Sequence, residues 1–124
     1  QINETSINLF ELETIKRKGL EQTCDSALAA LLHQPIKGFW VHIDADVIHD
    51  DEMPAVDYRL PDGLRFDELR VVLKKIMASG RAVGMSLGIY NPALDPRGVL
   101  ALKLVDLVSD ALSHRPQAAG TSKG

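Results

Sequence analysis

The sequence has little cysteine, few aromatic residues and no long apolar run, and each absence narrows what the chain can be. Cys24 is the only cysteine among 124 residues, so a disulfide within the chain and a cysteine zinc cluster are both excluded. The apolar stretches are too short to cross a bilayer, and the polar N-terminus lacks the charged-then-apolar order of a signal peptide. We therefore predict a cytoplasmic protein with no membrane partner.

Charge is low and mixed. The chain carries 14 basic and 17 acidic residues, a net charge of −3, and its lysines and arginines are scattered. No segment provides the basic face that would neutralise phosphates, so nucleic acid is not an expected partner. With 45% hydrophobic residues, the composition is that of one globular domain with a modest core. The chain opens on Gln1 within a polar stretch, which favours a piece of a longer protein.

Apolar periodicity divides the chain into alternating helices and strands. Helical spacing in the first third is broken at Gly19, which predicts a short helix, a turn and a longer helix. The predicted elements are helices within 9–32 and at 66–79 and 98–112, strands at 37–43 and 82–90, and a long ordered loop at 45–64. The apolar face of the last helix is assigned to Val99, Leu102, Val105 and Leu112. This alternation predicts an α/β fold in which flanking helices pack on a parallel sheet.

The stretch WVHIDADVIHDD, which begins at position 40, ends a buried strand in two aspartates. Residues i and i+2 of a strand share a face, so His42, Asp44 and Asp46 would lie together if the extended backbone continued to Asp46. Ligands of open parallel sheets gather beyond the carboxyl ends of strands, where this pair is expected. Two close carboxylates repel, and a divalent cation between them is the simplest compensation. Carboxylates favour Mg²⁺ or Mn²⁺, and a nearby histidine favours Mn²⁺ or a later transition metal.

Simpler interpretations stay open at this point. Asp44 and Asp46 would equally serve as loop caps that accept backbone N–H bonds and face water. His42, taken alone, fits a packed and hydrogen-bonded histidine, and His49 fits a solvated residue in an acidic loop. A phosphatase of the haloacid dehalogenase type also ends a buried strand in Asp-x-Asp, with the first aspartate as nucleophile. The Val-Ile pair that follows here differs from the small pair expected in that class.

The residues after the aspartate pair carry a family resemblance. Pro54-Ala55 and Gly63 follow Asp44 and Asp46 at the distances of the ureohydrolase signature, so the stretch resembles arginase, agmatinase and formiminoglutamase. The similarity continues through the helix GLRFDELRVVLKKI and the strand and turn VGMSLGIYNPALD. It extends over most of the chain, from Leu9 to Leu112.

The resemblance implies a fold, a metal centre and a substrate class. Residues 1–113 would be the C-terminal portion of an arginase-like α/β domain of three layers, and 114–124 a disordered tail. Asp44 and Asp46 would be ligands in a binuclear Mn²⁺ centre, which activates water to attack a guanidino or formimino carbon and release urea or formamide. The small-molecule substrate pocket would be lined by His42, His49, Met53, Pro54 and Ala55. The family also implies a homo-oligomer.

The chain departs from the family pattern at several positions. His42 replaces the usual serine, and Asp50 replaces a proline, alanine or glutamine, without a change of spacing. Ser86 stands where an acidic residue is usual, and Ile89 where members that hydrolyse guanidines commonly carry a glutamate. The family's earlier His motif and Asp-x-His-x-Asp motif are not among these residues. We therefore expect the chain to be inactive alone, and the alternative is a non-catalytic binding or assembly module.

Overall fold

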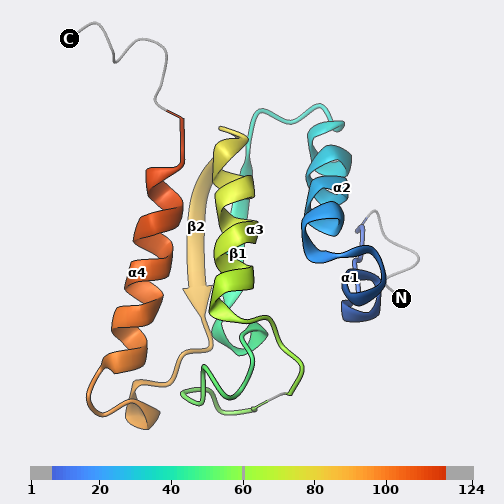
Figure 1. Cartoon of the computed structure of the whole chain (residues 1–124). Coiled ribbons are helices and arrows are strands. Elements are labelled where there is room, and N and C mark those ends of the chain that lie inside the picture. The colour runs from blue at the N-terminus through green and yellow to red at the C-terminus, as the bar shows by residue number, and fades with distance from the viewer. Residues whose placement is uncertain (1–6, 60, 117–124) are drawn as a thin grey trace, which may run out of the picture. The chain divides into compact units, whose positions relative to one another are not determined.

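The computed structural model describes residues 7–59 and 61–116. The chain divides into two compact units, Gln1–Ile36 and Lys37–Gly124 (Figure 1). The sheet and every predicted site residue belong to the second unit. Within the described ranges, every helix is too short or too polar to cross a membrane.

The first unit contains two helices that meet at a glycine. Helix α1 spans Leu12–Lys18 and helix α2 spans Leu20–Leu32. Gly19 between them has φ of 91°, in the region that favours glycine, and its N–H donates to the Ile15 carbonyl at 2.8 Å. The Thr23 hydroxyl donates to the Gly19 carbonyl at 2.8 Å and so fixes the start of α2. The predicted break at Gly19 is confirmed.

The second unit is a β-α-β-α arrangement. Its elements in chain order are β1 (Phe39–Asp44), the 3₁₀ turn η2 (Ala45–Val47), α3 (Phe66–Ala78), β2 (Ala82–Gly88), the 3₁₀ turn η3 (Pro92–Leu94) and α4 (Val99–Ser113). The two strands pair in parallel, with His42 opposite Ser86 and Asp44 opposite Gly88. The predicted α/β fold with a parallel sheet is therefore confirmed.

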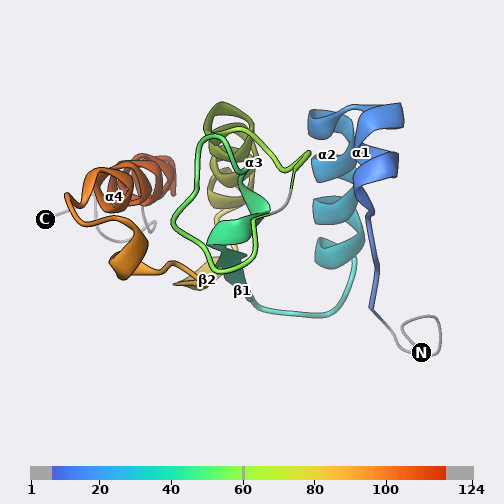
Figure 2. The ribbon, with the colours of Figure 1, turned by 90° about the horizontal axis from the view of Figure 1, so that it is seen from below.

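Only one face of the two-stranded sheet is covered by this unit's helices. Val41 and Ile43 of β1 are buried in one hydrophobic core with α3 and α4, which lie on the same side of the strands (Figure 2). Alternate residues of β1 point to the other face, where Trp40 is 62% exposed. The alternation of side chains along β1 thus separates core residues from the predicted site residues His42 and Asp44.

Helix α4 packs with a different face from the one predicted. Its buried residues are Leu104, Leu107 and Ala111. The residues assigned to the apolar face are exposed by half or more: Val99, Leu102, Val105 and Leu112. The assignment was wrong because α4 carries apolar residues on both sides, so periodicity does not select the packed face. Beyond the helix, Arg115 donates from Nε to the Ala82 carbonyl at 3.2 Å; residues 117–124 of the expected tail lie outside the described residues.

The long loop after β1 is ordered by its own backbone. Ile48 and Leu64 form a parallel bridge, and Leu64 exchanges backbone hydrogen bonds of 2.8 Å with Val47 and His49. Gly63 lies against this bridge, where a Cβ atom would come within 2.7 Å of the Val47 carbonyl oxygen. The loop therefore closes on itself at the carboxyl end of β1, and glycine at position 63 permits the close approach.

Candidate metal site at the carboxyl edge of the sheet

Asp44 is the last residue of β1, and its side chain is 48% exposed. Its backbone is extended, with φ of −94° and ψ of 131°, and it occupies the N-cap position of turn η2. A capping aspartate would accept a backbone N–H bond there, yet the Asp44 side chain makes no such bond. The capping interpretation is therefore wrong for Asp44, whose carboxylate stands at the edge where ligands of parallel sheets bind.

Asp46 lies in turn η2 and is half-buried. The extended backbone ends at Asp44, so the condition under which both aspartates would share a strand face is not met. Within 7–59 and 61–116, no hydrogen bond or ion pair engages the Asp46 carboxylate, and the Asp44 carboxylate is engaged only at Oδ1. Both side chains therefore keep free lone pairs that a cation could use.

The His42 ring stands beside Asp44 on the exposed face. Its Nε2 lies 2.8 Å from Asp44 Oδ1, and its Nδ1 lies 2.6 Å from Ser86 Oγ. The Trp40 indole Nε1 donates to the same Ser86 oxygen at 3.1 Å. His42 is thus hydrogen-bonded as predicted, but it is not packed, because its side chain is 57% exposed.

The sequence-based interpretation missed that Trp40 and Ser86 are hydrogen-bonded to each other and that Ser86 is hydrogen-bonded to His42. Ser86 was singled out only as a departure from the family pattern, and its neighbour across the sheet depends on strand register. The signal lies in matched sizes: β1 places Trp40, His42 and Asp44 on this face, and β2 provides Gly84, Ser86 and Gly88. A Cβ atom on Gly84 would lie 2.1 Å from the Trp40 ring, so small residues on one strand make room for large ones on the other.

The donor set suits a hard divalent cation. Carboxylate oxygens at a sheet edge, with a histidine holding one of them, are the ligands and outer partners common for Mn²⁺ or Mg²⁺. Among the described residues of this edge, Asp44 and Asp46 have carboxylate oxygens free to bind such an ion.

A second acidic group lies further along the loop. Potential ligand atoms of His49, Asp50 and Asp51 lie within 4.8 Å of one another. The Asp51 N–H donates to His49 Nδ1 at 3.1 Å, which occupies the lone pair that a metal would need. Arg59 Nη2 lies 3.8 Å from Asp50 Oδ2, so an arginine already balances one carboxylate. The group ties the loop to itself, and His49 is not solvated as predicted, since its side chain is only 19% exposed.

The expected pocket residues of the loop lie partly in the core. Met53 and Ala55 have no exposed surface, whereas Pro54 is half-buried. The Asn91 N–H donates to the Ala55 carbonyl at 2.8 Å, and Asn91 Nδ2 donates to Asp57 Oδ1 at 2.7 Å. The loop after β1 is therefore tied to the turn after β2, and both strand ends meet at one edge.

The turn after β2 has an unusual backbone and a strong anchor. Ile89 has φ of 68°, which is rare for a β-branched residue, and is 53% exposed. The Tyr90 hydroxyl donates to Asp95 Oδ2 at 2.6 Å, and the Ala101 N–H donates to the same oxygen at 2.9 Å. The Tyr90 hydrogen bond, helped by backbone donors of α4, lowers the pKa of Asp95, and the same bond raises the pKa of Tyr90.

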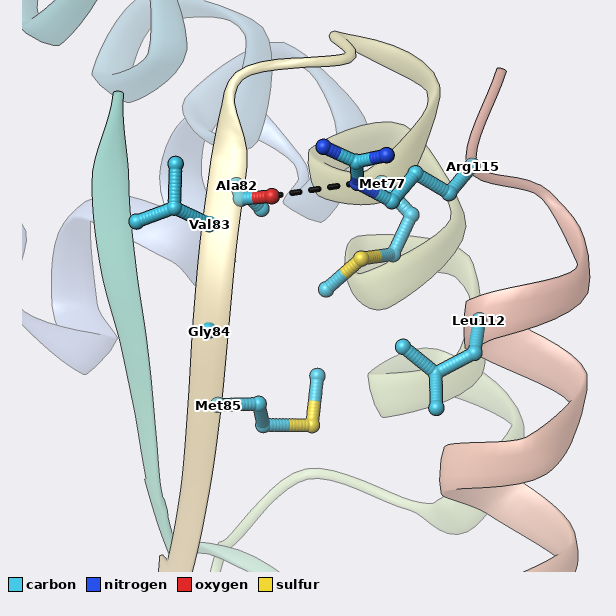
Figure 3. A pocket seen from close by; sticks show the side chains of 7 residues that line it. All are labelled: Met77, Ala82, Val83, Gly84, Met85, Leu112 and Arg115. Atoms are coloured by element: carbon cyan, nitrogen blue, oxygen red, sulfur yellow. Dashed lines mark hydrogen bonds between the residues drawn. The ribbon is translucent and has the colours of Figure 1, made fainter. Parts of the chain in front are cut away.

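A small cavity lies at the other end of β2 (Figure 3). Its volume is about 130 Å³, and Met77, Met85 and Leu112 line it together with backbone of the first half of β2. The Arg115 bond to the Ala82 carbonyl crosses its rim. Ala82 begins β2 and Gly88, opposite Asp44, ends it, so this apolar cavity is separate from the predicted site residues.

A β-α-β unit with free carboxylate oxygens at the carboxyl edge of its parallel sheet defines the class: an α/β protein with a candidate cation site. Comparisons with known proteins give the family. The arginase family model matches residues 1–113. An N(omega)-hydroxy-L-arginine amidinohydrolase from Streptomyces lavendulae is 32% identical over 93% of this chain and 44% of its own length. An arginase from Brucella melitensis is 26% identical over 91% of this chain and 37% of its own length.

Solved structures agree on the fold. A formimidoylglutamase from Bacillus subtilis superposes with a TM-score of 0.84 at 23% identity, covering 93% of this chain and 36% of the other. An arginase from the same species gives a TM-score of 0.81 at 21% identity, covering 90% and 38%. The chain belongs to the arginase family, and it spans less than half the length of these relatives.

Proposed function

We propose that this chain contributes Asp44 and Asp46 to the manganese centre of a ureohydrolase that cleaves a linear C–N bond of a guanidino or formimino substrate. The observation that supports it is the Asp44 carboxylate at the carboxyl edge of the sheet, held by His42 and not used as a cap. A carboxylate with a free oxygen at this edge of a parallel sheet is best explained as a ligand of a hard cation. The small-molecule substrate, a homo-oligomeric assembly and a cytoplasmic location belong to the same proposal.

The residues of this chain would have distinct parts in that reaction. Asp44 and Asp46 would hold the cation, and a bound Mn²⁺ pair would supply an activated water and stabilise the charge that develops on the substrate. The loop that contains Pro54 would wall the site, with Met53 and Ala55 holding it from the core. Asn91 would keep that wall in register with the turn after β2. Because most family ligands come from other segments, we expect the chain alone to be inactive.

The test is Mn²⁺-dependent release of urea or formamide by the native polypeptide that contains this sequence. Asp44→Asn should reduce both the activity and the bound Mn²⁺ by at least about tenfold, because the amide binds a hard cation weakly. Asp62→Asn is the matched control, since Asp62 is an exposed turn residue with φ of 66°, which asparagine tolerates. Equal Mn²⁺ binding by the Asp44→Asn protein and the unaltered protein would contradict the proposal.

A second candidate function rests on the turn after β2. Ile89 and Ser86 stand where acidic residues are usual in guanidine-hydrolysing members, and Ile89 keeps a strained backbone without supplying a carboxylate. A non-catalytic binding or assembly module would fit this loss. The native polypeptide would then bind Mn²⁺ weakly or not at all and would release neither urea nor formamide from any guanidino or formimino compound offered.

A further inference from the structure

A continuous line of hydrogen bonds runs across the exposed face of the sheet. It begins at Trp40 Nε1, passes through Ser86 Oγ at 3.1 Å, enters the His42 ring at Nδ1 over 2.6 Å, and ends with Nε2 at 2.8 Å from Asp44 Oδ1. We call these four residues, Trp40, Ser86, His42 and Asp44, the relay. None of them is covered by the helices of their own unit, since Trp40 is 62% and the His42 side chain 57% exposed.

The direction of the protons follows from the chemistry of the two end residues, Trp40 and Asp44. An indole N–H can only donate, so Ser86 Oγ accepts from Trp40. At the other end an ionised Asp44 can only accept, so the 2.8 Å contact needs the proton on His42 Nε2, and a neutral ring then accepts the Ser86 hydroxyl proton at Nδ1. With Nδ1 accepting, the ring proton sits on Nε2 and is donated to Asp44 Oδ1. The relay therefore selects one tautomer of a neutral His42 and points it at one oxygen of Asp44.

The backbone holds the relay in place. His42 and Ser86 face each other in the parallel register, and Gly84 lies beneath the Trp40 ring. A Cβ atom on Gly84 would come within 2.1 to 2.7 Å of three ring carbons, so the indole can lie flat on β2 only because position 84 is glycine. Contacts between the two adjacent strands thus fix the His42 ring, which would otherwise rotate freely at a surface position.

The order serine, histidine, aspartate occurs in hydrolases in which the serine is the nucleophile. Here the serine oxygen already accepts a hydrogen bond from Trp40, which stabilises its lone pair and lowers its nucleophilicity. Asp44, in contrast, has one oxygen engaged by the relay and leaves Oδ2 unengaged among the described residues. The direction of these hydrogen bonds therefore favours a role in orienting Asp44 over a role in which Ser86 is the nucleophile.

We propose that His42 is a positioning residue for Asp44, and that Ser86 and Trp40 set its tautomer. The inference rests on the proposed metal site: a histidine N–H on Oδ1 would fix the carboxylate rotamer and leave Oδ2 available to a cation. Outer partners of this kind typically change metal affinity about tenfold to a hundredfold when they are lost. The two departures from the family pattern, at positions 42 and 86, act together in this proposal, because Ser86 orients His42.

The test measures Mn²⁺ affinity of the native polypeptide by calorimetry, with the His42 tautomer read from ¹⁵N shifts of the imidazole. His42→Ser and Ser86→Ala should each weaken Mn²⁺ binding about tenfold or more. His42→Gln should restore part of the affinity, because its amide can still donate toward Asp44. His33→Ser is the control, since His33 is an exposed residue at the end of α2. Ser86→Ala should also shift the His42 signals away from the pure Nε2–H tautomer.

The outcomes separate this inference from the proposed function. If the unaltered protein binds Mn²⁺ and Asp44→Asn abolishes binding, while His42→Ser and Ser86→Ala bind as the unaltered protein does, the positioning role is refuted and the metal site stands. If the unaltered protein binds no Mn²⁺, the metal site and the positioning role fall together. An unchanged tautomer in Ser86→Ala, with the fold intact by circular dichroism, overturns the part assigned to Ser86 irrespective of metal.

Discussion

At the scale of single residues, a side chain at position 63 would collide with the backbone that leads out of β1. A Cβ atom there would lie 2.7 Å from the Val47 oxygen and 2.8 Å from the His49 nitrogen, and backbone atoms cannot step aside as a flexible side chain can. Gly63→Ala should therefore lower the unfolding free energy of the native polypeptide by about 1–3 kcal/mol, measured by urea denaturation. Gly88→Ala is the control, because its nearest neighbours would be 3.7 Å away. An equal loss of unfolding free energy in both variants would refute the steric crowding at position 63.

Asp95 gives a prediction about pH. Its pKa is lowered in the folded state, first by the Tyr90 hydroxyl and then by backbone N–H groups at the start of α4. A lowered pKa means that this contribution to stability is present above the unfolded value near 3.8 and is lost as pH falls through the folded value. Asp95→Asn should lower the melting temperature at pH 7 by several degrees. It should also make the melting temperature fall less steeply as the pH is lowered.

The control for Asp95→Asn is again Asp62→Asn, which removes one carboxylate from an exposed turn. Melting curves of the three proteins between pH 7 and the acid limb give the comparison. If the Asp95→Asn protein melts in acid with the same slope as the unaltered protein, the Tyr90 bond does not contribute as the geometry indicates. Tyr90→Phe should behave like Asp95→Asn near neutral pH, since it removes the other end of the bond.

At the scale of the elements, α3 and α4 are joined by a cluster of charges that centres on Asp110. Arg70 Nη1 donates to Asp110 Oδ2 at 2.9 Å, and Lys74 lies 3.8 Å from the same oxygen. The Arg70 hydrogen bond is the main cause of a lowered pKa at Asp110. Arg70 also donates to Asp106, whose side chain is 75% exposed and therefore well screened by water.

This difference predicts unequal effects of two similar substitutions. Asp110→Asn should lower the melting temperature by more than Asp106→Asn, because Asp110 accepts from more cations and is only 33% exposed. The gap between the two variants should narrow in 1 M NaCl, because salt screens the attraction of Arg70 and Lys74 for Asp110, whereas water already screens the exposed Asp106 pair at low salt. Thermal melts at low and high salt measure it, and an equal effect of both substitutions at low salt would show that the cluster does not hold α4 to α3.

The elements themselves could be predicted from sequence more fully than their contacts. The break at Gly19, both strands, helix α3 and the long loop follow from periodicity and turn residues, as does the parallel pairing. The packed face of α4 could not be predicted, because α4 has apolar residues on its exposed side as well as on its packed side. Only the tertiary fold determines which of them are buried. Likewise, Asp44 was found from its place at a strand end, whereas the relay needed the register that sets Ser86 opposite His42.

At the scale of the whole molecule, apolar surface remains exposed on the second unit. On α4, Leu102 is 69% and Val105 64% exposed, and on β2 Val83 is 66% exposed. Large apolar side chains exposed at neighbouring positions of a helix, such as Leu102 and Val105, favour a surface that is covered in the working protein. The chain also spans less than half the length of its arginase-family relatives. The isolated 124-residue polypeptide is therefore expected to associate in solution.

Association through α4 can be tested with a single charge. Leu102→Glu places a carboxylate on the exposed stripe, whereas Ser109→Glu adds the same charge at an exposed polar position of the same helix. Burial of one leucine contributes about 1.5–3 kcal/mol, so Leu102→Glu should weaken self-association at least about tenfold, and Ser109→Glu should not. Light scattering across a concentration series measures both. If the unaltered chain stays monomeric throughout, the exposed apolar residues of α4 do not drive association. If both substitutions have an equal effect, the change in association comes from net charge.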